Sequence, residues 1–257
     1  MSDENALTVP GSSAVSFMAK QKDAIARNSL VGSQMEESTG IKASRFFPFV
    51  QLLQRTSNAL DQGHNPGTFL FRRSGQDKNP VNLGSSFPAY VCSIRGKAIY
   101  YDKENNMVFA EYETVIDGVR TKSPGYDEFV AAAKSCASEL NPAYRNGLDV
   151  LLWIPALKTF ATYFANTVSS VSAVEQMVSP YLGCPVRFQS EQKKNTKGSW
   201  YTPACIDTDE DMEAIPTEAE FDAALVMFNQ PPARREEADG GDVEGAKKIE
   251  GARKRVR

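Results

Sequence analysis

The 257-residue chain has little of the chemistry on which enzymes and metal sites depend. It contains one histidine, His64, and four cysteines, none in a CxxC pair. A structural zinc site needs four closely arranged Cys or His ligands, so none is expected. A Ser–His or Cys–His pair would have to use His64, which lies in the turn-forming segment DQGHNPG. GxxxxGK[ST] and GxGxxG are absent too. We therefore expect no enzyme, no metal and no cofactor.

Long apolar runs and targeting signals are also lacking. No stretch of about 18 apolar residues could span a membrane. The N-terminal sequence MSDENALTVPGSS is polar and acidic, unlike a signal peptide. We expect a cytoplasmic protein with no membrane partner. In a reducing cytosol, its cysteines are interpreted as free thiols, and whether Cys184 and Cys205 lie close together stays open.

Composition divides the chain into three parts. Residues 1–45 are expected to form a helical or loop extension, and 46–230 a single α+β domain, since 41% hydrophobic content supplies a core. Residues 231–257 have almost no apolar content and predict a disordered, mixed-charge tail that ends basic. Before the tail, residues 207–222 carry eight acidic side chains and no basic one. They lack the spacing of a calcium loop and are interpreted as a solvated acidic linker.

The pattern of apolar residues predicts the elements of the domain. Helices are expected over 45–60, where Pro48 suits a helix start, and over 126–140 and 158–182. Another helix is expected after Pro216, with Phe221, Ala224, Leu225 and Phe228 on one side. Aromatic and β-branched residues predict strands over 68–73, 88–102, 107–116 and 148–157.

The strand over 88–102 has two contrasting faces. Alternation places Cys92, Ile94, Ala98 and Tyr100 on a face suited to a core. The other face carries Ser93, Arg95, Lys97 and Tyr101. That second face is either the solvated outer face of an antiparallel sheet or a ligand-facing surface.

A basic β-hairpin is predicted over 183–206. Two strand-like arms flank the polar turn KKNTKG, in which Gly198 suits positive φ. With Val186 and Phe188 turned inward, Arg187 and Lys193 turn outward, and only one of Trp200 and Tyr201 can face inward. Lysines at a hairpin tip also serve solubility alone, and both rings could be core or rim residues.

Cations and aromatic rings together are typical of single-strand binding, because phosphates follow a basic groove while bases stack on rings. If the hairpin and the 88–102 strand adjoin, they supply both ingredients. The candidate nucleic-acid-binding residues are Arg95, Lys97, Tyr101, Arg187, Lys193, Lys194, Lys197, Trp200 and Tyr201.

Several motifs resemble those of phage-encoded single-stranded-DNA-binding replication proteins with an OB-like barrel. They are RFFPFVQLLQRTSNAL, NPGTFLF, VNLGSSF, KAIYYD and the stretch FATYF to YTPAC, within residues 45–206. The resemblance implies an OB-like core and a role in phage replication. Many such proteins end in an acidic, aromatic-tipped segment that recruits partners, whereas this chain ends KKIEGARKRVR. Residues 207–222 or the segment EEADGGD could serve instead.

We therefore expect an α+β protein with an antiparallel OB-like β-barrel or sheet, flanking helices and a disordered C-terminal tail. The expected function is non-enzymatic binding of single-stranded DNA, as an accessory to phage replication or recombination in the host cytoplasm. Replication or recombination proteins are further partners, and a homo-oligomer stays open. The alternative is an interaction module that binds a host or phage protein through a sheet edge or the acidic helix. A third reading is an enzyme whose site becomes visible only in the fold.

Overall fold

The computed structural model describes residues 47–74, 77–102, 104, 107–116, 118–139, 142–196, 198–208 and 214–229. The predicted N-terminal extension, the predicted tail and Lys197 lie outside these residues, so nothing here tests those predictions.

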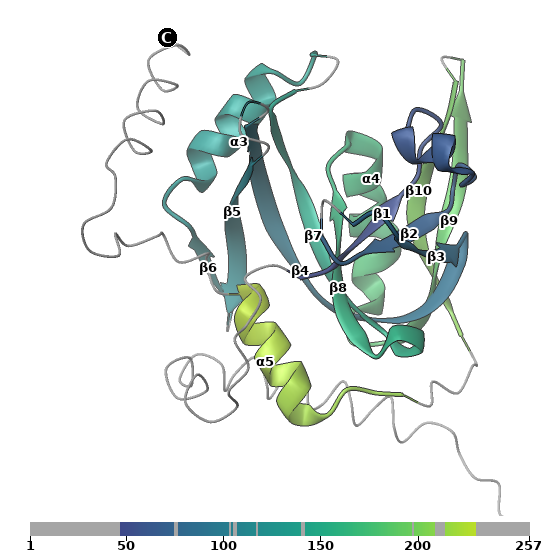
Figure 1. Ribbon diagram of the computed structural model, residues 1–257. Coiled ribbons are helices and arrows are strands. Elements are labelled where there is room, and N and C mark those ends of the chain that lie inside the picture. The colour runs from purple at the N-terminus through teal and green to yellow at the C-terminus, as the bar shows by residue number, and fades with distance from the viewer. Residues whose placement is uncertain are drawn as a thin grey trace, which may run out of the picture.

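The described strands form one ten-stranded sheet, most of whose pairs are antiparallel (Figure 1). Its order is β10-β9-β4-β7-β8-β1-β2-β3, while β5 pairs with β4 and β6 with β5. The α+β class is thus confirmed, but the strands do not close into a barrel. The strands are β1 (Phe49–Leu52), β2 (Phe69–Arg72), β3 (Val81–Gly84), β4 (Ser86–Asp102), β5 (Met107–Ile116), β6 (Val119–Lys122), β7 (Tyr144–Ile154), β8 (Thr159–Ala165), β9 (Pro185–Asn195) and β10 (Gly198–Asp207).

Helices are fewer and shorter than the strands. The α-helices are α3 (Tyr126–Ser135), α4 (Val168–Ala173) and α5 (Glu218–Asn229). Short 3-10 turns are η1 (Asn58–Gln62), η2 (Pro155–Leu157) and η4 (Ser179–Tyr181), and α4 continues into the single-turn π-helix η3 (Val174–Val178).

Strand β4 organises the sheet. Its first residues, Ser86–Tyr90, pair with β9, and its last, Gly96–Asp102, pair with β5. Between Tyr90 and Tyr100 its other edge pairs with β7. In Figure 1, β4 sweeps from the side of the molecule that carries β9 and β10 to the side that carries α3. The two ends of this strand therefore belong to different parts of the surface.

Apolar side chains form a core on each face of the sheet. The inner face, as we call it, carries the main core, in which the rings of Phe69, Phe87 and Phe188 meet at 5.3–5.5 Å between centroids. Val174 and Val178 of η3 join this cluster. On the outer face, Trp153 and other buried residues of β4, β7 and β8 pack against α5. The predicted apolar stripe of α5 is confirmed, because Phe221, Ala224, Leu225 and Phe228 are all buried.

A β-bulge in β4 changes one predicted face. The register of β4 against β7 shifts between Val91 and Ser93. As a result Cys92 packs with α5 on the outer face, while Ile94 packs on the main core. The prediction that Cys92 and Ile94 share a face was wrong, because the extra residue of the bulge breaks the alternation.

Two predicted helices are wrong in whole or in part. Within 45–60 the structure has β1 and then η1, because residues 49–52 pair with β2 and residues 49–50 also pair with β8. Within 158–182 residues 159–165 form β8, and the helix begins only after Thr167, whose side chain caps it together with Ser170. Pairing with neighbouring strands overrides local periodicity, and the aromatic and β-branched sequence TFATYFA suits a strand.

The remaining element predictions are confirmed. The strands over 68–73, 88–102, 107–116 and 148–157 correspond to β2, β4, β5 and β7. The helix over 126–140 corresponds to α3, which ends at Ser135. The hairpin over 183–206 corresponds to β9 and β10.

Candidate nucleic-acid interface

The β9–β10 hairpin extends beyond the strand that supports it. Residues 198–207 of β10 pair with 195–186 of β9 in continuous antiparallel register. Only Pro185–Gln189 of β9 pair with β4, so the distal half of the hairpin stands beyond the first residue of β4. At the tip, Gly198 has a φ of 143°, a backbone conformation that residues with side chains rarely adopt.

Alternation assigns the side chains of the hairpin to its two faces. Phe188 lies on the inner face with Phe87, so Arg187 and Lys193 lie on the outer face. Directly opposite pairs share a face, which puts Trp200 beside Lys193 on the outer face. Tyr201 packs against the main core. The prediction that only one of these two rings faces inward is therefore confirmed.

A glutamine side chain joins the hairpin to the end of β1. The Tyr201 N–H donates to Gln54 Oε1, and Gln54 Nε2 donates to the Tyr201 carbonyl, both at 2.9 Å. The amide group of Gln54 thus takes the place of a neighbouring strand at the edge of β10. Close by, the Ser190 hydroxyl donates to the Gly67 carbonyl at 2.6 Å. These side-chain contacts hold the hairpin where strand pairing is missing.

The position of the Tyr201 ring explains why residue 67 is a glycine. A Cβ on Gly67 would lie 2.5 Å from the Tyr201 ring, and the φ of Gly67 is +81°. Both the close approach and the backbone conformation require glycine. Tyr201 is therefore half-buried in a fixed position, and its ring is less accessible than the sequence alone suggested.

The hairpin lysines differ in their surroundings. The side chain of Lys193 is 44% exposed, and its Nζ lies 2.6 Å from Glu191 Oε2, on the same outer face. Lys194 is exposed and alternates to the inner face, opposite Ser199. Arg187 is half-buried, with Nη1 3.4 Å from the Ser86 hydroxyl. The predicted cations of the hairpin are thus divided between its two faces.

Two polar atoms beside Lys193 are buried without a partner. Trp200 Nε1 and Thr202 Oγ1 have no hydrogen-bond partner, although both atoms are inaccessible to solvent. They are two residues apart on the same face of β10. Leaving such a group unpaired typically costs about 1–3 kcal/mol. The outer face of the hairpin therefore holds donors that the described residues do not satisfy.

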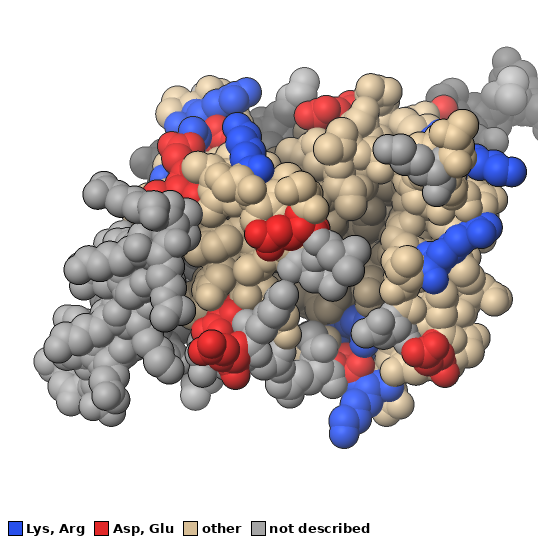
Figure 2. Space-filling model, turned by 90° about the horizontal axis from the view of Figure 1, so that it is seen from above, with Lys and Arg blue, Asp and Glu red and all other residues tan. Residues whose placement is uncertain are grey.

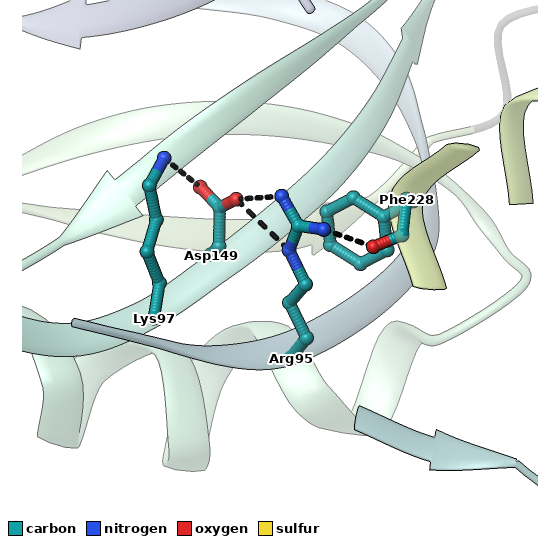
Figure 3. A network of polar contacts seen from close by, with 4 residues as sticks. All are labelled: Arg95, Lys97, Asp149 and Phe228. Atoms are coloured by element: carbon teal, nitrogen blue, oxygen red, sulfur yellow. Dashed lines mark hydrogen bonds and ion pairs between the residues drawn. The ribbon is translucent and has the colours of Figure 1, made fainter. Parts of the chain in front are cut away.

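Arg95, the first candidate on β4, is not on an open surface. Its residue is 6% exposed, and its Nε and Nη2 donate to Asp149 Oδ2 at 3.2 and 2.9 Å (Figure 3). Nη1 donates to the carbonyl of Phe228 in α5. The guanidinium lies between the rings of Tyr112 and Phe228, at 3.6 and 4.0 Å from their centroids. The expectation of a ligand-facing Arg95 was wrong, because α5 covers it.

Lys97 belongs to the same buried network. Its Nζ lies 3.3 Å from Asp149 Oδ1 and 4.9 Å from the centre of the Phe164 ring, and its side chain is 18% exposed. Figure 3 shows Lys97 and Arg95 on opposite sides of the Asp149 carboxylate. Tyr101, four residues further along β4, is half-buried. Two cations thus surround one fully buried carboxylate, which leaves one excess positive charge.

The candidates on β4 and those on the hairpin do not form one groove. Roughly 30 Å of strand separates Lys97 from Pro88, the partner of Arg187, at about 3.3 Å per residue. The core under α5 lies between them on the outer face. On the face seen from above, Lys and Arg gather in separate groups interleaved with Asp and Glu (Figure 2). The structure does not bring the eight described candidates together.

The described residues offer little for nucleophilic or metal chemistry. Burial raises the pKa of the Cys205 thiol to about 12, and it also raises the pKa of Cys92 and of Cys184. A raised pKa leaves little thiolate near neutral pH, so these thiols are poor nucleophiles. Within the described ranges no three His, Cys, Asp or Glu side chains come together as metal ligands. No described helix is long and apolar enough to cross a membrane.

Comparisons with protein-family models, curated proteins and solved structures found no match to this chain.

Sequence reasoning missed four residues of these sites. Asp149 had a visible signal, because a carboxylate within an apolar strand needs a buried partner. Phe228 was expected in the core but not over Arg95, and neither Gln54 nor Thr202 carried a signal. Whether each of these side chains has a partner depends on contacts between segments that are far apart in the sequence.

Proposed function

We propose that the protein binds single-stranded DNA through the β9–β10 hairpin and catalyses no reaction. The observation that carries the proposal is the cross-strand pair of Trp200 and Lys193 on a hairpin that extends beyond β4. An indole offers a face on which a base stacks, and an adjacent ammonium attracts the phosphate. The proposed role is that of an accessory to phage replication or recombination, with the curled sheet as an OB-like support.

We confine the proposed site to the hairpin. Its residues are Arg187, Lys193, Lys194, Lys197, Trp200 and Tyr201. The proposed site does not include Arg95, because it is buried. It does not include Lys97 and Tyr101 either, because they lie at the far end of β4. A strand several nucleotides long would fit along the distal half of the hairpin. Single strands are preferred, because stacking on Trp200 requires a base face that a duplex hides.

Intrinsic fluorescence tests the proposal directly, because the two tryptophans differ in environment. Trp153 is 4% exposed and its Nε1 donates to the Ala214 carbonyl at 2.8 Å, so it should not respond to a ligand. Trp200 is half-buried and should change its emission when oligo-dT is added at low salt. Anisotropy of labelled single-stranded and duplex oligonucleotides, at two salt concentrations, should show tighter binding of the single strand.

Trp200→Phe should remove most of the emission change, and Trp153→Phe should keep it. The proposal is wrong if oligo-dT changes neither the emission nor the anisotropy at low salt.

One observation favours the protein-interaction alternative. Among the described strands β6 pairs only with β5, and Val115 and Val119 on this pair are 51% and 64% exposed. An unpaired strand edge can accept a strand from another protein. Under this alternative Val119→Lys would weaken partner binding and the hairpin lysines would be dispensable. Oligonucleotide binding that depends on those lysines would reject it.

A further inference from the structure

The outer face of the hairpin carries a compact group of four polar side chains. Lys193 lies directly across from Trp200, and Glu191 directly across from Thr202. Opposite residues in an antiparallel pair have Cβ atoms about 4.5–5.5 Å apart, so the four side chains are mutual neighbours. Thr202 is 1% exposed. We call this group the outer-face cluster.

The hydrogen bonding of the outer-face cluster is incomplete in a specific way. Lys193 and Glu191 satisfy each other at 2.6 Å, but the Trp200 indole N–H and the Thr202 hydroxyl have no partner. An indole nitrogen only donates, and a hydroxyl can donate. What these two donors lack is an acceptor within reach, because the Glu191 carboxylate is bonded to Lys193 instead. Neighbouring Lys193 makes an anionic acceptor the favourable one.

We propose that the outer-face cluster is a binding subsite for a phosphodiester group. In this subsite the Trp200 N–H and the Thr202 O–H donate to phosphate oxygens, and Lys193 supplies the charge. The inference rests on the proposed function and deepens it, because it names the group on the strand that is recognised and adds Thr202 to the site. The indole can donate from its edge to the phosphate while its face stacks on a base.

Glu191 acts in this subsite as a competitor for Lys193. In the free protein the ammonium is bound to the carboxylate. A phosphate must take the ammonium from Glu191 and also approach its negative charge. The carboxylate therefore lowers affinity for any anion, and its removal should tighten binding.

The two unpaired atoms lie beneath the surface, so the ligand reaches them only after a side chain moves. In the proposed subsite the Trp200 ring is the side chain that moves, because it is half-buried while its neighbour Thr202 is almost completely covered. Binding should then change the emission of Trp200 even with a strand that has no bases to stack.

Thr202→Val is the decisive variant, because valine has nearly the shape of threonine without the hydroxyl. Since the hydroxyl has no partner in the free protein, the variant should be as stable as the parent or more stable. Its affinity for oligo-dT, measured by anisotropy, should fall about tenfold, because hydrogen bonds to charged groups are strong. If the Thr202 hydroxyl served folding alone, the variant would not lose affinity while keeping its stability.

Thr114→Val is the matched control. Thr114 is also buried, at 4% exposure, but its hydroxyl donates to the Thr121 carbonyl at 3.5 Å. This variant should not gain stability and should leave binding unchanged. An abasic strand of the same length identifies the acceptor, since it retains the sugar–phosphate backbone and lacks the bases.

Glu191→Gln supplies an independent measurement in the opposite direction. It should tighten binding of oligo-dT several-fold, while Glu139→Gln, which changes the net charge equally on an exposed site beyond α3, should change it little.

The outcomes separate this inference from the proposed function. If the parent binds oligo-dT and Thr202→Val binds it equally well, the subsite is wrong and the proposed function stands. If Thr202→Val weakens oligo-dT but not the abasic strand, a base is the acceptor and the phosphate assignment is wrong. If the parent binds no oligonucleotide, the proposed function itself fails.

Discussion

Two charged clusters on the outer face of one sheet show how differently a protein can use the same residue types. In the buried network, Arg95 and Lys97 share the carboxylate of Asp149, and α5 covers Arg95. In the outer-face cluster, Lys193 has Glu191 as its partner, while Trp200 Nε1 and Thr202 Oγ1 have none. In the first cluster each charged side chain has a partner, and Arg95 and Asp149 are buried. In the second cluster two hydrogen-bonding groups have no partner, and the Lys193 side chain reaches solvent.

The difference separates a charged network that stabilises the fold from a cluster for which we propose a role in binding. A buried ion pair must be completed within the protein, because an unpaired charge in the interior costs several kcal/mol. A cluster whose unpaired groups are neutral donors can remain incomplete at a smaller cost, about 1–3 kcal/mol for each group, and a ligand can complete it. Sequence reasoning treated Arg95 and Lys193 alike as ligand-binding cations, and their surroundings separate them.

Breaking the buried network should have the largest effect. Asp149→Ala leaves Arg95 buried without its carboxylate, which typically costs about 3–5 kcal/mol. Urea denaturation should show this loss in the free energy of unfolding. Asp127→Ala is the control, because its ion pair with Lys122 at 2.8 Å is exposed and such pairs are worth about 0–1 kcal/mol. Equal losses in the two variants would show that the network does not hold the fold.

Neutralising the hairpin lysines should affect binding instead of folding. The triple change of Lys193, Lys194 and Lys197 to Gln should reduce the salt slope of single-strand binding by roughly 2 units, at about 0.7 per phosphate contact. Anisotropy titrations at several salt concentrations measure the slope. Stability should change by no more than about 0.5 kcal/mol, as is usual for surface positions. An unchanged slope would mean that the hairpin lysines serve solubility.

Alkaline pH should lower the free energy of unfolding, because buried thiol and phenol groups resist losing their protons. One of these groups is Cys205, on the inner face of the hairpin. Burial raises the pKa of Cys205 from 9.0 to about 12, and burial also raises the pKa of Tyr163. Above about pH 9 for the Cys205 thiol, and above about pH 10 for the Tyr163 hydroxyl, the unfolded group loses its proton while the folded one keeps it, so stability falls by about 1.4 kcal/mol per pH unit for each group.

Denaturation midpoints at pH 8, 9 and 10 measure this decline. Cys205→Ala should make the decline shallower, whatever its effect on absolute stability. The same slope in both proteins would show that Cys205 is not held in its neutral form.

The smallest expected effect concerns the contact that holds the hairpin in place. Gln54→Ala removes both hydrogen bonds to Tyr201 and should cost about 1 kcal/mol per bond or less, because water can partly replace them. Amide exchange at Tyr201 should become faster. Gln176→Ala is the control, since Gln176 bonds only to Ser172 within its own helix. Unchanged exchange at Tyr201 would mean that the hairpin keeps its position without Gln54.

The parts of the fold that were predicted correctly are those with strong local signals. The hairpin has two β-rich arms around a turn with a glycine, and α5 has a complete apolar stripe after Pro216. The two errors, over 45–60 and within 158–182, fall where a short apolar segment fits either period. In both places pairing with strands distant in the sequence decided the outcome.

For the candidate residues, the sequence predicted the face of the strand on which each lies but not what surrounds each side chain. Alternation correctly assigned Arg95 and Lys97 to one side of β4. It could not show that α5 would cover Arg95, because that contact joins residues 133 positions apart. Nor could it show that Asp149 would complete the network from 54 residues away.

The sequence by itself determined the α+β class, the β9–β10 hairpin, the apolar stripe of α5 and the scarcity of histidine and clustered cysteine. These features depend on residue type and spacing along the chain, so they can be read without coordinates. The tertiary structure alone decided which cations are enclosed, which ring of the Trp200–Tyr201 pair lies outside, and which donors remain unpaired. Burial and hydrogen-bond satisfaction depend on what a distant segment covers, and local sequence does not contain that information.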